Sequence, residues 1–400
     1  MIVKDYIEKR SLELEPDWIE MRRYLHANPE LSFEEAKTRG YISTKLQELG
    51  IPFTYQTDNF GLVGLIEGKN PAARTIALRA DMDALPLEEK NNTDYVSTVP
   101  GVMHACGHDV HMVNLLGAAR ILSELKNEFE GTVKLIFQPG EEKAPGGASM
   151  MIQKGVLDNP TVETIIGQHV FPELEAGKVG FKTGMYMASS DDIFITVSGK
   201  GGHGAQPHKT IDTVLIASHI IVALQQVVSR RADPIMPSVL TFGKIVGLGA
   251  TNVIPNEVKI EGTFRTFDEM WRLKAKQLIK EIVEGVGKAM GAEVDIRIKQ
   301  GYPYLKNEET LTKNAIDWAK DYLGSENVET VSLRMTSEDF AFYSQEIPAC
   351  FYRLGTGNKM KGISSLVHTP TFDIDESALK IGVGLMAWLA YKQLEPKLLK

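Results

Sequence analysis

The chain has 400 residues, a length that predicts two domains. Its hydrophobic share of 43% is enough for a normal core, and its interspersed 44 basic and 52 acidic residues argue against a nucleic-acid partner. No run of about 18 apolar residues is found, so no membrane-spanning helix is expected. The N-terminal stretch is charged throughout and lacks the apolar segment of a signal peptide, which favours a cytoplasmic location.

The first part of the chain predicts helices followed by alternating strands and helices. Residues 16–30 have helical apolar spacing, and residues 32–50 follow with Ser32 and Glu35 as a capping box. Strands are then expected at 61–68, 74–81, 131–138 and 162–170, with helices at 109–126 and 147–157. This alternation predicts an α/β layer with a mainly parallel sheet.

Residues 190 to 300 show a different order of predicted strands and helices. Strands are expected at 191–199, 238–247, 256–267 and 293–301, with helices at 212–231 and 268–291. The order β-α-β-β-α-β is that of a ferredoxin-like unit, inserted here into the larger domain. After residue 300 the α/β pattern resumes, with a helix at 309–324, a strand at 349–358 and a closing helix at 376–394.

The two cysteines, Cys106 and Cys350, differ in their surroundings. One disulfide in a large chain without a leader is improbable. Cys350 lies in the apolar run "IPACFYRLG" and is expected to be a small buried hydrophobe. Cys106 lies in "HACGHDVH", which leaves open a metal site or a nucleophile paired with His108.

Polar side chains follow the predicted strands, where sites of open α/β sheets collect. Candidates at these strand ends or in nearby loops are Asp81, Asp83, Cys106, His108, Glu141, Glu142, His169 and His368. Thiolate with imidazole favours zinc-like metals over magnesium or calcium. A pair of metal ions would need about this many ligands with one shared, and Cys106 is a candidate for that shared position.

Two adjacent acidic residues, Glu141 and Glu142, can divide the work of hydrolysis. Neighbours in an extended loop project to opposite sides, so one can bind metal while the other takes a proton from water. Motifs of serine hydrolases, P-loop proteins and H-E-x-x-H proteases are missing. A nucleophile pair of Cys106 and His108 stays open, but it leaves the glutamates and the other histidines unexplained.

Several of these residues also have plain structural interpretations. Asp81 and Asp83 can be turn residues, and His111 can merely flank the site. His26 is expected to be solvated or hydrogen-bonded, and His219, within an apolar helix, to be a core histidine.

The inserted unit carries a polar cluster of its own, "GKGGHGAQPH". Its glycines allow close approach of the backbone to a ligand, and His203 is a candidate to stabilise a developing oxyanion. The competing interpretation is a surface histidine on a flexible loop. Arg265 is either an ordinary surface arginine or a bidentate partner for a substrate carboxylate.

The motifs taken together resemble the binuclear metal amidohydrolases, a family that includes hippurate hydrolases, aminoacylases, plant auxin-conjugate hydrolases and N-acetyl-diaminopimelate deacetylases. The resemblance runs from about residue 18 to 390 and rests on "LHANPELSFEE", "LRADMDALPLEE", "HACGHDVH", "FQPGEE", "GQHVFP", "GKGGHGAQPH", "NVIPNEVKIEGTFRTF", "SEDFAFY" and "VHTPTFDIDE". The family is distantly related to bacterial metal carboxypeptidases.

The resemblance implies a role for each candidate. It implies two divalent metal ions, zinc before manganese, cobalt or nickel, with the ligands Cys106, His108, Glu142, His169 and His368. It also implies Glu141 as general base, Asp83 as an orienting carboxylate, His203 and Asn252 as groups that bind the scissile carbonyl, and Arg265 as the partner of the substrate carboxylate. A homodimer through the inserted domain is expected.

The sequence therefore predicts a metal-dependent amidohydrolase with an α/β catalytic domain at residues 1–187 and 301–400. An inserted α+β lid and dimerisation domain is expected at residues 188–300. The expected reaction is hydrolysis of N-acyl amino acids. The nearer alternative is a dipeptidase or carboxypeptidase that uses the same metals, and the farther one is a non-catalytic metal-binding scaffold. A spare carboxylate at Glu141 argues against the scaffold. Asp109 is expected to cap the helix that follows His108.

Overall fold

The computed structural model describes residues 2–56 and 60–396, and the chain divides into two compact units. The first unit comprises Met1–Gly184, Lys306–Ser332 and Phe342–Lys400, and the second comprises Met185–Leu305 and Leu333–Ala341. A few residues on either side of the expected insertion, and the separate segment at 333–341, group with the second unit.

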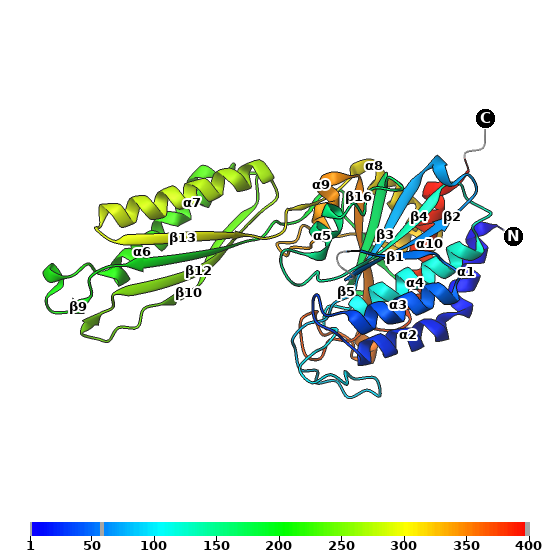
Figure 1. Cartoon of the computed structure of the whole chain (residues 1–400), viewed down its shortest axis with the longest axis horizontal. Helices are drawn as coiled ribbons and strands as arrows, with labels where there is room; N and C mark the ends of the chain where they lie inside the picture. Colours follow the sequence, from blue (N-terminus) through cyan, green and yellow to red (C-terminus); the bar gives the residue numbers. More distant parts are fainter. Residues whose placement is uncertain (1, 57–59, 397–400) are drawn as a thin grey trace. The chain divides into compact units, whose positions relative to one another are not determined.

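The first unit is built on a large mixed sheet with the strand order β1-β2-β4-β3-β5-β16-β6-β15 (Figure 1). Its strands are β1 (Phe53–Gln56), β2 (Gly61–Glu67), β3 (Thr75–Asp81), β4 (Thr132–Gln138), β5 (Thr164–Glu175), β6 (Val179–Phe181), β15 (Val328–Thr330) and β16 (Ala349–Gly357). The central strands β4, β3, β5 and β16 run parallel, and β1 and β2 are antiparallel. Every residue of β3 and β4 is buried, as expected for strands covered on both faces. The predicted mainly parallel sheet is confirmed.

Helices flank this sheet. They are α1 (Val3–Glu13), α2 (Glu15–Ala27), α3 (Ala36–Glu48), α4 (His108–Glu124), α5 (Gly147–Gln153), α8 (Glu309–Leu323), α9 (Ala341–Glu346) and α10 (Ala378–Leu394). Helix α4 packs against α2, α3 and α10 and is buried along most of its length, so its first turn is held from several sides. That turn carries the sequence "HACGHDVH".

The start of α3 differs from the sequence prediction. No side chain of the N-cap residue Glu35 caps the helix, and the carboxylate of Glu30 instead accepts the backbone N–H of Thr38 at 2.8 Å. The Ser32 hydroxyl donates to Asp83 at 2.6 Å. The predicted capping box of Ser32 and Glu35 is therefore wrong, because both side chains are engaged by distant parts of the chain.

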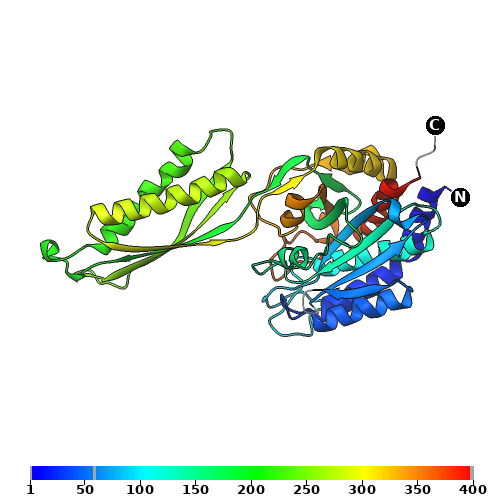
Figure 2. The ribbon, with the colours of Figure 1, turned by 45° about the horizontal axis from the view of Figure 1, so that its top comes forward.

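The second unit is a smaller α+β body. Its sheet has the order β10-β12-β8-β13, all antiparallel, and two helices, α6 and α7, lie on one face of it (Figure 2). The elements are β8 (Asp191–Ser198), β9 (Gly202–His203), α6 (Thr213–Gln226), β10 (Ser238–Val246), β11 (Val253–Ile254), β12 (Glu257–Thr266), α7 (Glu269–Ala289) and β13 (Glu293–Gln300). The order β8-α6-β10-β12-α7-β13 confirms the predicted ferredoxin-like unit. Strands β7 (Gly184–Met187) and β14 (Leu305–Asn307) stand where the chain passes from one unit to the other.

Helix α6 bears on two expectations, one about membrane-spanning helices and one about His219. With the π-helical turn that follows it, α6 forms one helix, Thr213–Arg231, that is long and apolar enough by length and composition to cross a membrane. Core helices of globular proteins have the same length and composition, so the expectation that no helix spans a membrane stays a prediction. Its inward side chains, Ile216 and Ile220 among them, pack in the core of the second unit, as those of a core helix do. His219 lies on the exposed face of α6 and is not the core residue expected.

Candidate metal centre

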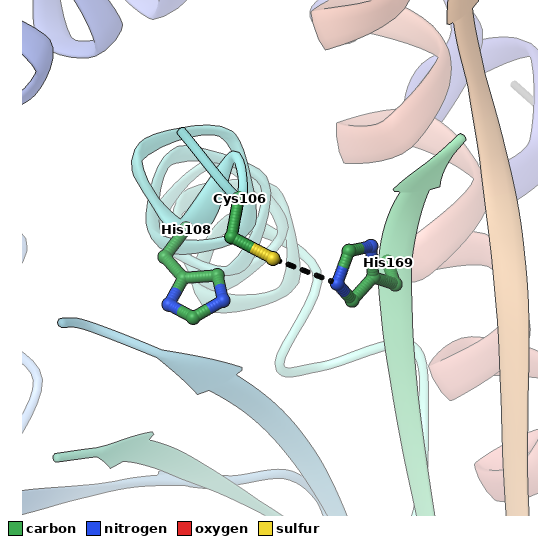
Figure 3. Close-up of side chains that lie close together, drawn as sticks. All are labelled: Cys106, His108 and His169. Atoms are coloured by element: carbon green, nitrogen blue, oxygen red, sulfur yellow. Dashed lines mark hydrogen bonds between the residues drawn. The ribbon is translucent and has the colours of Figure 1, made fainter. Parts of the chain in front are cut away.

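The side chains of "HACGHDVH" meet residues from β5 and from two loops of the first unit. The Cys106 Sγ lies 3.4 Å from Nε2 of His169 (Figure 3). It also lies 3.3 Å from Nε2 of His368. The same His368 nitrogen lies 3.1 Å from Oε1 of Glu142. Potential ligand atoms fall within 4.8 Å of one another in the group of Cys106, His108 and His169 and in the group of Cys106, Glu142 and His368. Cys106 belongs to both groups, which is the arrangement that a ligand shared by two metal ions requires.

Gly107 allows the backbone to place a cysteine and a histidine on either side of it. It is the N-cap residue of α4 and has φ 80°, in the left-handed region that favours glycine. A Cβ atom there would lie 2.5 Å from Cγ2 of Val170, so a larger residue would push α4 and β5 apart. The two flanking side chains, Cys106 and His108, then point into the same cluster.

Asp109 does not cap α4 as predicted. The helix has no side-chain cap at its N-terminus, and Asp109 faces the interior instead. Its Oδ2 accepts from Nε of Arg22 at 2.9 Å and lies 2.8 Å from Nδ1 of His26. All three side chains are 0% exposed. A buried charge needs a partner, and here Arg22 outcompetes the local helix N–H groups for the carboxylate.

The orientation of His169 is fixed by its backbone neighbour. Its Nδ1 donates to the Val170 carbonyl at 2.8 Å, so Nε2 keeps its lone pair and faces Cys106. Burial lowers the pKa of His169 well below its usual value, which favours the neutral ring that metals bind. His111, expected at most to flank the site, is buried, accepts the Val170 N–H at 3.0 Å and lies 2.6 Å from Asp81 through its other nitrogen. It supports the strand that carries His169.

Two carboxylates set the electrostatics around His108. Burial by itself would lower the pKa of His108, but Asp81 and Asp83 outweigh burial and raise it to about 10. Among the described residues, Nε2 of His108 has no hydrogen-bond partner. Asp83 also accepts the backbone N–H groups of Glu141 at 3.0 Å and Glu142 at 2.9 Å. Asp83 therefore contacts His108 and also orients the loop that carries Glu141 and Glu142.

The charge balance of the cluster fits a bound cation. Burial raises the pKa of the Cys106 thiol well above its usual value, and the negative charges of Glu142 and Glu141 add to this effect. A thiolate ligand at this position therefore needs a positive charge beside it, which a divalent metal supplies. The donor set of one thiol, three imidazoles and a carboxylate suits zinc and the other late first-row metals.

His368 occupies a strained backbone conformation. Its φ is 62°, a left-handed value that is uncommon for residues other than glycine, and its N–H donates to the Ala105 carbonyl at 2.8 Å. Strain of this kind persists where the surrounding structure holds it and is concentrated at functional sites. The sequence identified His368 as a candidate ligand but gave no sign of this conformation.

The three remaining candidates lie in the second unit. His203 ends the short strand β9, is exposed, and its Nδ1 accepts the N–H of Ala205 at 3.1 Å. Asn252 accepts the N–H of Gly204 through its carbonyl at 2.8 Å, so it lies beside His203. Arg265, on β12, is partly buried and donates to the Met335 carbonyl at 3.1 Å.

The sequence analysis missed the buried polar network of Arg22, His26 and Asp109. The buried positions of α2 are Trp18, Arg22, Leu25 and His26, a helical stripe that contains two polar residues. A charged residue in an otherwise apolar stripe was the available signal, because such a residue is buried only when it is paired. Cys350 lies in β16 and, like Cys106, is buried and forms no disulfide. The expectation that Cys350 is a small buried hydrophobe is confirmed.

The sequence of the chain is similar to a known family model and to known hydrolases. Residues 77–392 match the family model described as Peptidase family M20/M25/M40. The chain is 43% identical over 309 residues to the N-acyl-L-amino acid amidohydrolase of Geobacillus stearothermophilus, covering 77% of this chain and 83% of the relative. It is 38% identical over 397 residues to thermostable carboxypeptidase 2 of Saccharolobus solfataricus, covering 97% and 99%.

A solved structure is similar as well. The Bacillus subtilis YXEP protein, a dinuclear metal binding peptidase of the M20 family, superimposes with a TM-score of 0.81 at 34% identity. The similarity covers 96% of this chain and 99% of that one.

Proposed function

The chain belongs to peptidase family M20/M25/M40 and is a hydrolase of that family, and we propose that it cleaves the amide bond of N-acyl amino acids. The products are a carboxylic acid and a free amino acid. The observation that carries the proposal is the cluster in which Cys106 belongs to two ligand groups, while Glu141 forms a further group with His108 and Glu142. The similarity to an N-acyl-L-amino acid amidohydrolase supports this choice of substrate.

Two divalent metal ions fit the donor set. The residues that would hold them are Cys106, His108, Glu142, His169 and His368, with Cys106 shared between the two. When bound, such ions polarise a carbonyl group and lower the pKa of water. Zinc suits the thiolate and imidazole donors, and manganese, cobalt and nickel are the alternatives.

Glu141 is the proposed general base. Its backbone N–H and that of Glu142 are both held by Asp83, so the directions of the two adjacent carboxylates are set by the same group. Glu141 takes a proton from the attacking water as the water oxygen bonds to the amide carbon. The carbon–nitrogen bond then breaks, and Glu141 returns the proton to the departing amine.

The second unit is proposed to complete substrate binding. His203 and Asn252 are assigned to the scissile carbonyl and Arg265 to the substrate carboxylate, as the family resemblance implies. The exposure of His203 supports this role, because an exposed imidazole is free to meet a ligand. A homodimer through this unit and a cytoplasmic location stay predictions.

The second candidate function is that of a dipeptidase or carboxypeptidase. The observation in its favour is the 38% identity to thermostable carboxypeptidase 2, over nearly the whole of both chains. Both reactions cleave an amide bond with the same metal centre, so the donor set does not separate them. The difference lies in whether the group removed from the nitrogen is an acyl group or an aminoacyl group.

The deciding experiment is a substrate panel. The protein, reconstituted separately with zinc, manganese, cobalt and nickel, is assayed against N-acetyl and N-benzoyl amino acids and against dipeptides with the same C-terminal residues. We expect kcat/KM for the best N-acyl amino acid to exceed that for the matching dipeptide by roughly tenfold or more. The reverse order would establish the peptidase instead.

A further inference from the structure

Residues 32–35, which are distant in the sequence, contact the loop that carries Glu141 and Glu142. Gly140 has φ 56°, and a Cβ atom there would lie 2.4 Å from the ring of Phe33. The Gly140 N–H donates to Oε1 of Glu35 at 2.7 Å. Residues 32–35 thus contact the turn directly before Glu141 by packing and by a hydrogen bond.

A second contact leads from the same segment to the next two residues. The Ser32 hydroxyl donates to Asp83 at 2.6 Å, and Asp83 accepts the N–H groups of Glu141 and Glu142. Ser32 and Glu35 therefore restrain three consecutive backbone N–H groups, one of them directly and two through Asp83. The spacing of Ser32 and Glu35, interpreted in the sequence as a helix cap, serves this loop instead.

The burial of Glu35 is costly and has no local explanation. The residue is 1% exposed, and burial together with the nearby charge of Asp83 raises the pKa of Glu35 to about 7. Among the described residues, its Oε2 has no hydrogen-bond partner. A buried carboxyl group with one unpaired oxygen destabilises a fold, so its place here calls for a contribution to the site.

We propose that Glu35 is a positioning residue for the reaction: by accepting the Gly140 N–H, it fixes the turn that presents Glu141 to water and Glu142 to metal. The inference rests on the roles given to these glutamates in the proposed function. Groups behind metal ligands and catalytic groups hold them in working geometry, and losing one typically costs roughly 10–100-fold in affinity or activity.

The test compares four variants with the unmodified protein. Glu35→Ala removes the acceptor, and Glu35→Asp keeps the charge but shortens the side chain. Glu35→Gln keeps an acceptor oxygen at the same reach. Glu34→Ala is the matched control, since Glu34 is the exposed neighbour. For each variant we would measure kcat and KM with saturating metal, zinc affinity of the apoprotein against a chromophoric chelator, and thermal unfolding.

We expect Glu35→Ala and Glu35→Asp to lower kcat and to weaken zinc binding by roughly 10–100-fold, with KM within about threefold. Glu35→Gln should have kcat and zinc affinity within about threefold of those of the unmodified protein. Glu34→Ala should have the same kcat and zinc affinity as the unmodified protein. The Asp and Gln variants change the interior least, so they give the answer even if the Ala variant does not fold.

Three results would overturn the proposal. The first is normal kcat and zinc affinity in Glu35→Asp. The second is a loss of thermal stability alone. The third is an equal loss of kcat and zinc affinity in Glu35→Gln and Glu35→Asp, which would show that the effect does not depend on the oxygen that accepts the Gly140 N–H. The zinc measurement needs no substrate, so it stands even if the substrate panel favours dipeptides, and kcat would then be measured on a dipeptide.

Discussion

The metal cluster of the first unit and the His203 loop of the second unit are built in opposite ways. In the cluster, buried His169 has a fixed ring orientation, and buried Asp83 holds the backbone of the loop that carries Glu141 and Glu142. His203 ends one strand of a short two-stranded ribbon, and Asn252 directly precedes the other strand; both residues are exposed. The cluster is organised before any ligand arrives, whereas the His203 loop has little packing of its own to fix a side chain.

The largest effect should come from removing metal. The five proposed donors of the first unit would lose the two metal ions that they hold, so a chelator should abolish hydrolysis and a divalent transition metal should restore it. Hydrogen exchange should show faster exchange at residues 104–111 and little change in β10 and β12 of the second unit. Full activity in a sample verified to be free of metal would contradict the metal dependence.

The next effect concerns stability beneath the cluster, where two adjacent arginines offer a matched pair. Arg22 is 0% exposed and bonded to Asp109, so Arg22→Leu leaves a buried carboxylate without its cation and should cost about 3–5 kcal/mol of unfolding free energy. Arg23 is 40% exposed at its bridge to Glu376, so Arg23→Leu should cost at most about 1 kcal/mol. Urea denaturation measures both. Equal losses would show that the buried network is not what holds α2 against α4.

A smaller effect is expected from the second unit. His203→Ala should lower kcat by roughly 10²-fold, the scale for losing one oxyanion donor, with unchanged metal content and unchanged unfolding. Steady-state kinetics and metal analysis of the same sample measure this. Mixing this variant with Glu141→Gln tests whether the histidine acts across a dimer, because mixed dimers would then regain one intact site. Normal turnover by His203→Ala would remove the residue from the mechanism.

The helices, the strands and the grouping of the candidate ligands could be predicted from the sequence because they follow local rules. Apolar periodicity located β3, β4 and α4, and polar residues at strand ends located the cluster. Helix capping was not predictable in the same way. Ser32 and Asp109 have the right chemistry for caps, but Asp83 and Arg22, distant in the sequence, bind them instead.

The burial of polar residues was the second feature that the sequence did not predict fully. The apolar stripe of α2 hints that Arg22 is buried, but it does not identify the partner, a carboxylate that lies 87 residues further along the chain. The prediction for His219 was wrong, since an apolar helix does not reveal which face meets the sheet until the sheet is known. The unidentified partner of Arg22 and the wrong prediction for His219 have one cause, because tertiary pairing decides burial and periodicity alone does not.

The division of labour between Glu141 and Glu142 is the central claim, and one paired measurement tests it most directly. Turnover and bound metal are determined on the same samples of Glu141→Gln and Glu142→Gln. Glu141→Gln should keep nearly normal metal content with turnover lowered by roughly 10²-fold or more, and Glu142→Gln should lose metal. Normal turnover by Glu141→Gln, or loss of metal from that variant instead of the other, would contradict the account.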